Sequence, residues 1–421
     1  MKRRILDTHM LADLGSYLES QKQWAVSTLS SCIAFQSTSG NEVGVTPFLE
    51  EILRTLKGDT VAVPVPEELR DDSDFSQHSS AQPYSLRPNL VHRKKGSGNG
   101  RSLIVSGHSD VVPAAWEGAF SPCVKNGYLY GRGACDDKGP LVAWLLALKA
   151  LEHFGVELEG DLETHVVIEE EVGGNGALSL IRAGRKADGV IVLEPSELHI
   201  HPACRGALWF RIDVEGRSTH MASIQDGVNA AMEAISVIQS LERYENRLLK
   251  DSRDQPLFSR YERPVMVNIG MFQSGDWPST LPAHATIEGG VGFLPNRSLE
   301  VVRQEVADAI LDGTGSWVRD HHRVSFDRLH NEAYQIPSEH PLVNAMVSSC
   351  EAAGLSSKVH GMSASCDARL YYHRGGMPVI VFGPGSLRDA HSEQEKVGIV
   401  DLVKAAQSLF CMTYHWGGWI G

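Results

Sequence analysis

Hydrophobic and polar positions repeat along the chain with periods that predict regular structure. Apolar residues recur at helical spacing over 18–34 and again over 45–56, which predicts two helices near the start. The stretch 66–87 is rich in Pro, Asp, Ser and Gln and is typical of a surface excursion. Two strands are predicted next, over 89–92 and 102–108, with a Lys- and Gly-rich turn between them.

Helical and strand patterns alternate from residue 138 onward. Helices are predicted over 138–154 and 176–182, and strands over 162–168 and 189–193. This alternation indicates an α/β domain with a mixed, largely parallel sheet and helices on both faces. Ligands of such sheets bind beyond the carboxyl ends of the strands, so the residues directly after each strand are the first candidates for chemistry.

The pattern changes near residue 205. The predicted order becomes strand, helix, strand, strand, helix, strand, over 207–216, 227–243, 265–272, 285–293, 299–311 and 322–329. This is the ferredoxin-like α+β order. We therefore expect a first domain over 1–204, an inserted domain over 205–330, and a return to the first domain over 331–421. The return is predicted to hold a helix over 341–353, a strand over 378–382 and a helix over 397–410.

Composition narrows the class of protein. A chain of 421 residues exceeds one compact core, in keeping with two domains. Its formal net charge of −13 argues against a nucleic-acid partner, which needs a basic face. The seven cysteines are odd in number and form no Cys-x-x-Cys pair, which favours a reducing compartment over a disulfide framework.

Location is predicted from the absence of targeting patterns. The basic residues at the start are followed by no apolar stretch, so no secretory signal is predicted. No run approaches the roughly 18 apolar residues of a membrane span. We expect a cytoplasmic protein with no membrane partner.

Histidines and carboxylates follow the predicted strands or open the predicted helices. They lie in five segments, at His108 and Asp110, Asp136 and Asp137, Glu169–Glu171, Glu194, and His391. Each segment alone has a structural interpretation: a packed histidine, a helix cap, or a solvated acidic turn. Together they would place nitrogen and oxygen donors on one sheet edge, and a cation would relieve the repulsion among adjacent carboxylates.

Such a donor set has a characteristic chemistry. Nitrogen and oxygen ligands without thiolate suit zinc, with cobalt or manganese tolerated. Two metals that share a carboxylate can polarise a carbonyl and lower the pKa of a bridging water toward about 7. A neighbouring carboxylate can then take the proton from that water. The pattern therefore favours hydrolysis.

These motifs carry a family resemblance. The chain resembles the metallohydrolases that include acetylornithine deacetylase, succinyl-diaminopimelate desuccinylase, aminoacylase and carboxypeptidase G. The shared motifs are Gly-His-Ser-Asp-Val-Val-Pro, Tyr-Gly-Arg-Gly-Ala-x-Asp-x-Lys-Gly, Glu-Glu-x-Gly-Gly, Glu-Pro and Ala-His, in the family's order.

The resemblance implies two Zn²⁺ per subunit, with Co²⁺ or Mn²⁺ able to substitute. It implies that His108 and Glu194 bind the first metal, that Glu171 and His391 bind the second, and that Asp136 bridges them. Asp137 stands where the family often has Met, so the adjacent pair leaves either aspartate open as the bridge.

Further roles are implied outside the metal ligands. Glu170 would be the general base, although the Glu169–Glu171 triplet leaves its position open by one residue. Asp110 would hold an imidazole. The family forms a homodimer through the inserted domain, and His220 would stabilise the oxyanion in the neighbouring subunit.

Substrate recognition departs from the family pattern. Ser279, in Pro-Ser-Thr-Leu-Pro, stands in place of an Asn-x-x-Pro and is a substrate-binding candidate. This form resembles the deacetylases and the formyl-aminopyrimidine deformylase branch more than the desuccinylase. Arg205 and Arg369 can each hold a substrate carboxylate in a bidentate pair, or form a structural ion pair instead.

We expect an amidohydrolase that removes a small acyl group, such as acetyl or formyl, from an N-acylated amino acid or related amine. The alternative within the family is a metallo-exopeptidase or dipeptidase, which differs in the pocket for the chain end. A dimeric binding protein with a degenerate site is the non-enzymatic alternative. Zinc content and a substrate panel separate the three.

Overall fold

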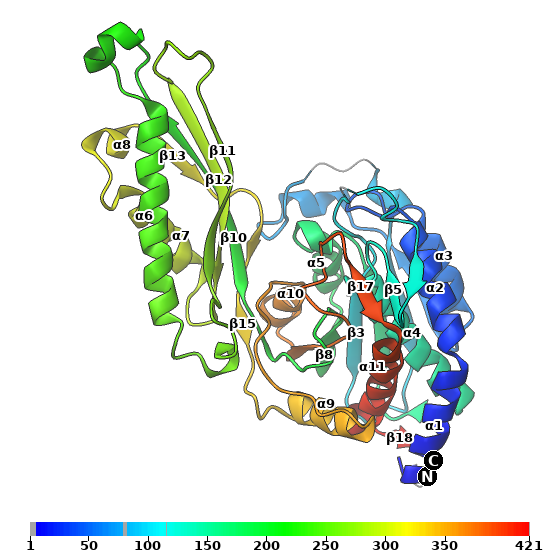
Figure 1. Ribbon diagram of the computed structural model, residues 1–421. Helices are drawn as coiled ribbons and strands as arrows, with labels where there is room; N and C mark the ends of the chain where they lie inside the picture. Colours follow the sequence, from blue (N-terminus) through cyan, green and yellow to red (C-terminus); the bar gives the residue numbers. More distant parts are fainter. Residues whose placement is uncertain (1–5, 79–81, 115, 421) are drawn as a thin grey trace. The chain divides into compact units, whose positions relative to one another are not determined.

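The computed structural model describes residues 6–78, 82–114 and 116–420 (Figure 1). The chain forms two compact units. The first ends at Pro202 and resumes over Ile336–His360 and from Cys366 onward, and the second comprises Ala203–Gln335 with Gly361–Ser365. No secretory signal is predicted at the start of the chain, and residues 1–5 of that stretch lie outside the described residues. In the part of the chain described, no helix is long and apolar enough to cross a membrane.

The first unit is built on a six-stranded sheet with the order β1-β2-β7-β3-β8-β16. The strands are β1 (Asp59–Val63), β2 (Asn89–Lys94), β7 (Leu162–Val167), β3 (Leu103–His108), β8 (Gly189–Val192) and β16 (Val379–Val381). The last four in this order run parallel, whereas β2 is antiparallel to its neighbours on both sides. β3, β8 and β16 are buried along their whole length, as expected for parallel strands covered on both faces.

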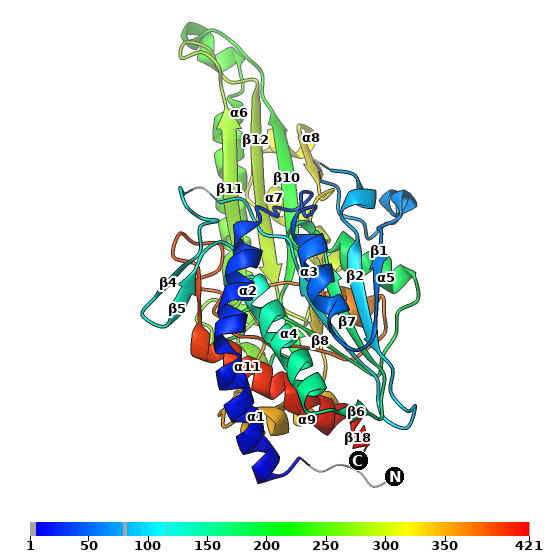
Figure 2. The same cartoon turned by 90° about the vertical axis from the view of Figure 1, so that its right-hand side faces the viewer.

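Helices cover both faces of this sheet, which confirms the predicted fold class. α4 (Lys138–His153) and α11 (Ile399–Met412) lie on one face, and α5 (Asn175–Arg182) and α10 (Ala368–His373) lie on the other (Figures 1 and 2). α4 is apolar on nearly every side because it packs against both α11 and α2. The remaining helices are α1 (Thr8–Ser20), α2 (Lys22–Ala34), α3 (Val45–Arg54) and α9 (Pro341–Ala352).

Three local predictions differ from the structure. The stretch 18–34 is not one helix, because α1 ends at Ser20 and α2 begins at Lys22. α10 was not predicted, and its six residues are too few to show a helical period. The stretch 66–87 is not a plain surface excursion, since Tyr84 and Arg87 are fully buried; its residues 79–81 lie outside the described part.

Short strands add a feature that the sequence did not predict. β5 (Tyr128–Tyr130) pairs with β4 (Cys123–Lys125) on one side and with β17 (Lys396–Gly398) on the other. A second small sheet joins β6 (Glu157–Leu158) to β18 (Trp419–Ile420). The pairing of β5 with β17 brings two loops distant in sequence, 131–137 and 383–395, next to each other.

The second unit has the predicted ferredoxin-like order. Its elements are β10 (Gly206–Glu215), α6 (Ala230–Asp251), β11 (Met266–Ser274), β12 (His284–Phe293), α7 (Leu299–Leu311), α8 (Ser316–Asp320), β13 (His322–Ser325) and β14 (His330–Asn331). The strand order β11-β12-β10-β13 leaves β11 at an edge. α6 and α7 cover one face of this sheet, and no helix among the described residues of this unit covers the other (Figures 1 and 2).

Residue alternation explains this one-sided packing. Every second residue of β10, such as Phe210 and Ile212, is buried in a core with α6 and α7, while Trp209 and Arg211 are exposed on the opposite face. The unit is bordered by β9 (Ala203–Cys204) and β15 (Tyr334–Gln335), which pair with each other. This pairing sets the borders of the unit a few residues outside 205–330.

Candidate metal centre

Charged residues gather at the carboxyl ends of the parallel strands. His108 is the last residue of β3, Glu170 and Glu171 follow β7 in a short 3₁₀ turn, and Glu194 lies two residues beyond β8. The strands are almost entirely buried, and the backbone hydrogen bonds between them hold these side chains at one edge. The edge is therefore the place where topology and chemistry coincide.

The predicted ligands converge at this edge. Donor atoms of His108, Glu170 and Glu194 all lie within 4.8 Å of one another, and so do those of His108, Asp136 and Glu171. His391 completes the cluster, since its Nε2 lies 3.1 Å from Glu171 and 3.2 Å from Asp136. Residues separated by up to 283 positions thus meet in one unit.

The two adjacent aspartates have different surroundings. Asp136 Oδ1 lies 3.2 Å from His108 Nε2, and its Oδ2 lies 3.2 Å from His391 Nε2, so one carboxylate faces both histidines. Asp137 instead accepts a hydrogen bond from the backbone N–H of His108 at 3.1 Å. Asp136 is therefore the carboxylate that faces both histidines, and Asp137 supports the end of β3.

Asp110 contacts both His108 and the backbone of Glu170 and Glu171. His108 Nδ1 is 3.0 Å from the backbone oxygen of Asp110 and 3.4 Å from its Oδ1. The Asp110 carboxylate also accepts hydrogen bonds from the backbone N–H groups of Glu170 and Glu171, each at 3.2 Å, and from Ser39 at 2.7 Å. One carboxylate thus orients the imidazole and the turn that carries the glutamates.

The side chain of Glu169 has different surroundings from those of Glu170 and Glu171. Its φ of +61° turns the backbone, and its buried carboxylate accepts hydrogen bonds from Tyr84 at 2.9 Å and Asn175 at 2.8 Å. Arg87 forms ion pairs with both Glu169 and Glu42. This network fixes the register of the triplet, because Glu170 and Glu171 are the members directed at the cluster.

Sequence reasoning missed this supporting network. Tyr84 and Arg87 lie in a polar, Pro-rich stretch without periodicity, and Glu42 lies between the first two predicted helices. Nothing in their local pattern distinguishes them from surface residues. A buried role becomes visible only once long-range contacts, such as those of residues 84 and 169, are known.

The electrostatics of the cluster favour a bound cation. Burial is the main cause that raises the pKa of Glu170 and Glu194 well above the ordinary value, and nearby carboxylates, such as Asp136 beside Glu194, add to it. Burial lowers the pKa of His391, but its hydrogen bonds to Asp136 and Glu171 outweigh this and raise the pKa to about 11. The carboxylates outnumber the groups that can neutralise them.

A buried carboxylate oxygen also favours a bound cation. Among the described residues, Oε1 of Glu194 is buried and has no hydrogen-bond partner. A buried carboxylate oxygen left without a donor is costly unless a cation takes that place. Imidazole nitrogens and carboxylate oxygens, with no thiolate among them, are donors that suit zinc. The residues present therefore fit a zinc centre.

The other predicted site residues lie elsewhere in their units. In the second unit, His220 is exposed and its Nδ1 accepts from the backbone of Ala222 at 3.1 Å. Its segment pairs with that of Ser279, whose carbonyl accepts from the Met221 N–H at 2.9 Å. In the first unit, Arg369 donates to the carbonyl of Gly173 at 2.8 Å, just beyond the glutamate turn.

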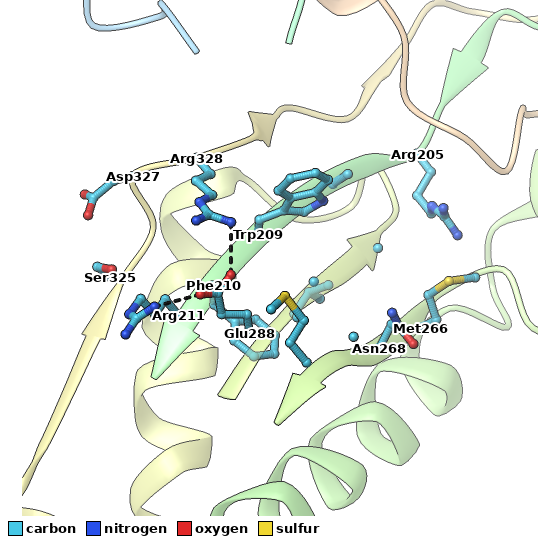
Figure 3. A pocket seen from close by; sticks show the side chains of 17 residues that line it. Arg205, Trp209, Phe210, Arg211, Met266, Asn268, Glu288, Ser325, Asp327 and Arg328 are labelled. Atoms are coloured by element: carbon cyan, nitrogen blue, oxygen red, sulfur yellow. Dashed lines mark hydrogen bonds and ion pairs between the residues drawn. The ribbon is translucent and has the colours of Figure 1, made fainter. Parts of the chain in front are cut away.

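Arg205 lines a hollow of about 440 Å³ on the bare sheet face of the second unit (Figure 3). Within the described residues, its buried Nε and Nη1 atoms have no hydrogen-bond partner. Burial lowers the pKa of Arg205 to about 10, so the guanidinium is still charged near neutrality. Gly292 makes room for it, because a Cβ there would lie 2.8 Å from Nε.

The rest of the hollow is lined by ion-paired, polar and apolar side chains. Arg211 and Arg328 both pair with Glu288, at 2.7 and 2.9 Å, away from Arg205 (Figure 3). Trp209 and Met266 supply exposed apolar surface. The hollow therefore combines the guanidinium of Arg205 with an apolar wall, while the carboxylate of Asp327 lies on the side away from Arg205 (Figure 3). This combination suits an anionic group attached to an apolar body.

Comparisons with known proteins give consistent results. Residues 104–415 match the family described as Peptidase family M20/M25/M40. The chain is 31% identical to an acetylornithine deacetylase from Myxococcus xanthus, over 78% of this chain and 84% of that protein. It is 29% identical to N-formyl-4-amino-5-aminomethyl-2-methylpyrimidine deformylase from Bacillus subtilis, over 79% of this chain and 84% of that protein.

Solved structures share the fold. A tripeptidase from Staphylococcus aureus superposes with a TM-score of 0.75 at 20% identity, covering 94% of this chain and 98% of that one. Human carnosine dipeptidase 1 superposes with a TM-score of 0.72 at 17% identity, covering 96% and 99%.

Proposed function

The chain belongs to peptidase family M20/M25/M40, a family of hydrolases, and on that basis we propose that it is a two-zinc amidohydrolase. It removes a small acyl group, such as acetyl or formyl, from an N-acylated amino acid or related amine. The observation that carries the proposal is the convergence of two histidines and several carboxylates at one sheet edge with a buried, unpartnered oxygen on Glu194.

In this proposal His108 and Glu194 hold one zinc ion, and Glu171 and His391 hold the other. Asp136 bridges the two, and its two oxygens, each 3.2 Å from one histidine nitrogen, support that role. Co²⁺ and Mn²⁺ can substitute, because the donor set is nitrogen and oxygen only. Asp110 supports the centre by holding His108 and the turn after β7.

Glu170 is the proposed general base. When bound, the metal pair supplies Lewis-acid polarisation of the amide carbonyl and acidifies the attacking water. Glu170 takes a proton from that water as the water oxygen attacks the amide carbonyl carbon, and it then delivers the proton to the leaving nitrogen. The C–N bond breaks, which frees the amine and the carboxylic acid. Burial raises the pKa of Glu170, which makes its carboxylate a stronger proton acceptor and supports the role of base.

The amine portion of the substrate is proposed to carry a carboxylate. The unpartnered guanidinium of Arg205 supports this, since a charge-assisted bidentate pair is the strongest contact it can form. The similarity to an acetylornithine deacetylase agrees with an N-acylated amino acid. Ser279 and Arg369 stay as predictions for substrate contacts.

A peptidase is the second candidate function. The superposition on a tripeptidase and a dipeptidase favours it, because those proteins share the whole fold with this chain. Both candidates use the same metal chemistry and differ in the groups on either side of the scissile bond. A dipeptide carries a free amino terminus on the acyl side of that bond, whereas a formyl or acetyl group carries none.

We further propose a homodimer formed through the second unit, with His220 stabilising the oxyanion in the neighbouring subunit. The edge strand β11 carries exposed Met271 and Phe272, and the start of α6 carries exposed Met232 and Ile235. Exposed apolar residues on an unpaired edge strand and an adjoining helix are typical of an interface. Analytical sedimentation tests the proposed dimer. We expect the wild type to sediment as a dimer and Phe272→Asp as a monomer. A monomeric wild type would contradict the proposal.

One panel tests the reaction. Zinc-loaded protein is given N-formyl, N-acetyl and N-succinyl amino acids beside unblocked dipeptides, and each is followed by release of free amine. We expect the formyl or acetyl compounds to be hydrolysed fastest, with loss of activity on chelation and return on adding zinc. Preference for dipeptides selects the peptidase, and hydrolysis that survives complete metal removal contradicts both.

A further inference from the structure

A single buried carboxylate joins the two loops that carry Asp136 and His391. Glu395 lies four residues after His391 and is 1% exposed. Its Oε1 accepts hydrogen bonds from the backbone N–H groups of Gly133 at 2.9 Å and of Cys135 and Asp136 at 3.2 Å each. Three backbone donors of one loop therefore point at one side-chain oxygen of the other.

The second oxygen of Glu395 is also engaged. Oε2 forms a buried ion pair with Arg132, which begins the same loop. The backbone oxygen of Glu395 accepts from the N–H of Gly131 at 3.1 Å, next to the pairing of β5 with β17. The pairing of β5 with β17 thus joins the two loops at one end, and from that end the Glu395 carboxylate reaches residues 132–136 of the other loop.

The loops pack too closely for this arrangement to be incidental. Gly385, in the loop before His391, lies so near Cys135 that a Cβ there would be 2.5 Å from the Cβ of Cys135. Cys135 Sγ also approaches the carbonyl of Ser386 at 3.7 Å. Asp136, which directly follows Cys135, is consequently fixed relative to His391 by contacts that do not involve either side chain.

We propose that Glu395 is a positioning residue that sets the separation of Asp136 and His391 by holding the backbone of residues 133–136. This inference rests on the proposed metal centre. Asp136 carries an oxygen toward each histidine, so a small shift of its backbone would change the fit of both ions. Partners of this indirect kind typically change metal affinity by about 10–100-fold when removed.

Cobalt binding by the full chain tests this. The metal-free protein is titrated with Co²⁺ against a chromogenic chelator, and the visible absorption of the loaded protein reports the ligand geometry. For Glu395→Gln we expect affinity for at least one Co²⁺ to fall by about 10–100-fold, with a changed absorption band and lower kcat at nearly constant KM. Glu395→Asp keeps the charge but withdraws the oxygen, so it is expected to weaken binding as well.

The matched control is Glu163→Gln. Glu163 lies near the start of β7, at the opposite end from the cluster, and pairs with Arg185 at 3.3 Å and His165 at 3.2 Å. It should leave cobalt affinity and absorption unchanged. Wild-type affinity and absorption in Glu395→Asp, or in a folded Glu395→Gln, overturn the inference. A wild-type chain that takes up no cobalt overturns the proposed function, and this inference with it.

Discussion

Glu169 and Glu170 are neighbours in sequence, yet they belong to two regions that treat buried charge in opposite ways. Burial raises the pKa of Glu169, but its hydrogen bond and ion pair with His78, the charge of Arg87 and the hydrogen bond from Asn175 outweigh this and lower the pKa to about 2. Glu170 faces other carboxylates, and its pKa rises well above the ordinary value. Compensated charge here holds the fold, whereas uncompensated charge marks the place where a ligand belongs.

The second unit shows the same contrast between compensated and uncompensated groups, here for positive charges. Arg211 and Arg328 are neutralised by Glu288, but Arg205 has no hydrogen-bond partner for its buried Nε and Nη1 among the described residues. Changing an uncompensated group should therefore alter activity and spare stability. Changing a compensated group should do the reverse.

The largest effect is expected for Glu170→Gln. Loss of the general base should lower kcat by about 10²–10⁴-fold. The zinc content should stay at the wild-type level, and the free energy of unfolding of the metal-free chain should not fall, because one repelling carboxylate is gone. Steady-state kinetics, metal analysis and urea unfolding measure the three. Full turnover would refute the assignment of the base.

Arg87→Met should have the opposite effect, because it changes a compensated group and should lower stability. It leaves the carboxylates of Glu42 and Glu169 buried without their shared guanidinium, at a cost of about 3–5 kcal/mol in the free energy of unfolding near neutral pH. Urea unfolding measures this cost. The control Arg247→Met breaks an exposed pair with Asp312 and should cost no more than about 1 kcal/mol. Equal unfolding midpoints for both variants would contradict the contrast.

Arg205→Met should act on substrate binding. We expect KM for an N-acyl amino acid to rise by about 10–100-fold, in line with the roughly 1.5–3 kcal/mol of a charge-assisted hydrogen bond. KM for the matching N-acyl amine without a carboxylate should not change. Arg247→Met, in the same unit but outside the hollow, serves as the control. Equal increases in KM for both substrates would count against a carboxylate partner.

The smallest effect is expected for Asp72→Asn. The hydrogen bond from Arg182 holds the pKa of Asp72 below its ordinary value. The stability this pair contributes is therefore present above the ordinary pKa and is lost as pH falls through the folded-state value. The pair is solvent-screened, so the variant should lose at most about 1 kcal/mol near neutral pH. Urea unfolding at several pH values measures the loss, and a difference from wild type that grows on acidification would contradict the sign.

Much of the fold follows from local sequence. The alternation over 138–193 and the strand-helix order of the second unit predict the two architectures, because each depends on burial periods that a short window contains. Glu170, Glu171 and Glu194 could be predicted as candidates for the same reason, since each closely follows a buried strand.

The remainder depends on distant contacts. The choice between Asp136 and Asp137 required their neighbours His108 and His391, which no spacing rule supplies. Arg87 looked like a surface residue because its partners are Glu42 and Glu169, far away in sequence. Nε and Nη1 of Arg205 have no hydrogen-bond partner within the described residues, and this too is a property of the folded sheet face.

The proposed reaction depends above all on two cations held by the cluster at the ends of β3, β7 and β8. Anomalous diffraction at the zinc edge, from crystals of zinc-loaded protein, measures their presence. We predict two peaks, one beside His108 and Glu194 and one beside Glu171 and His391, with Asp136 between them. A cluster without an anomalous peak, or zinc bound only elsewhere on the chain, would contradict the two-metal centre.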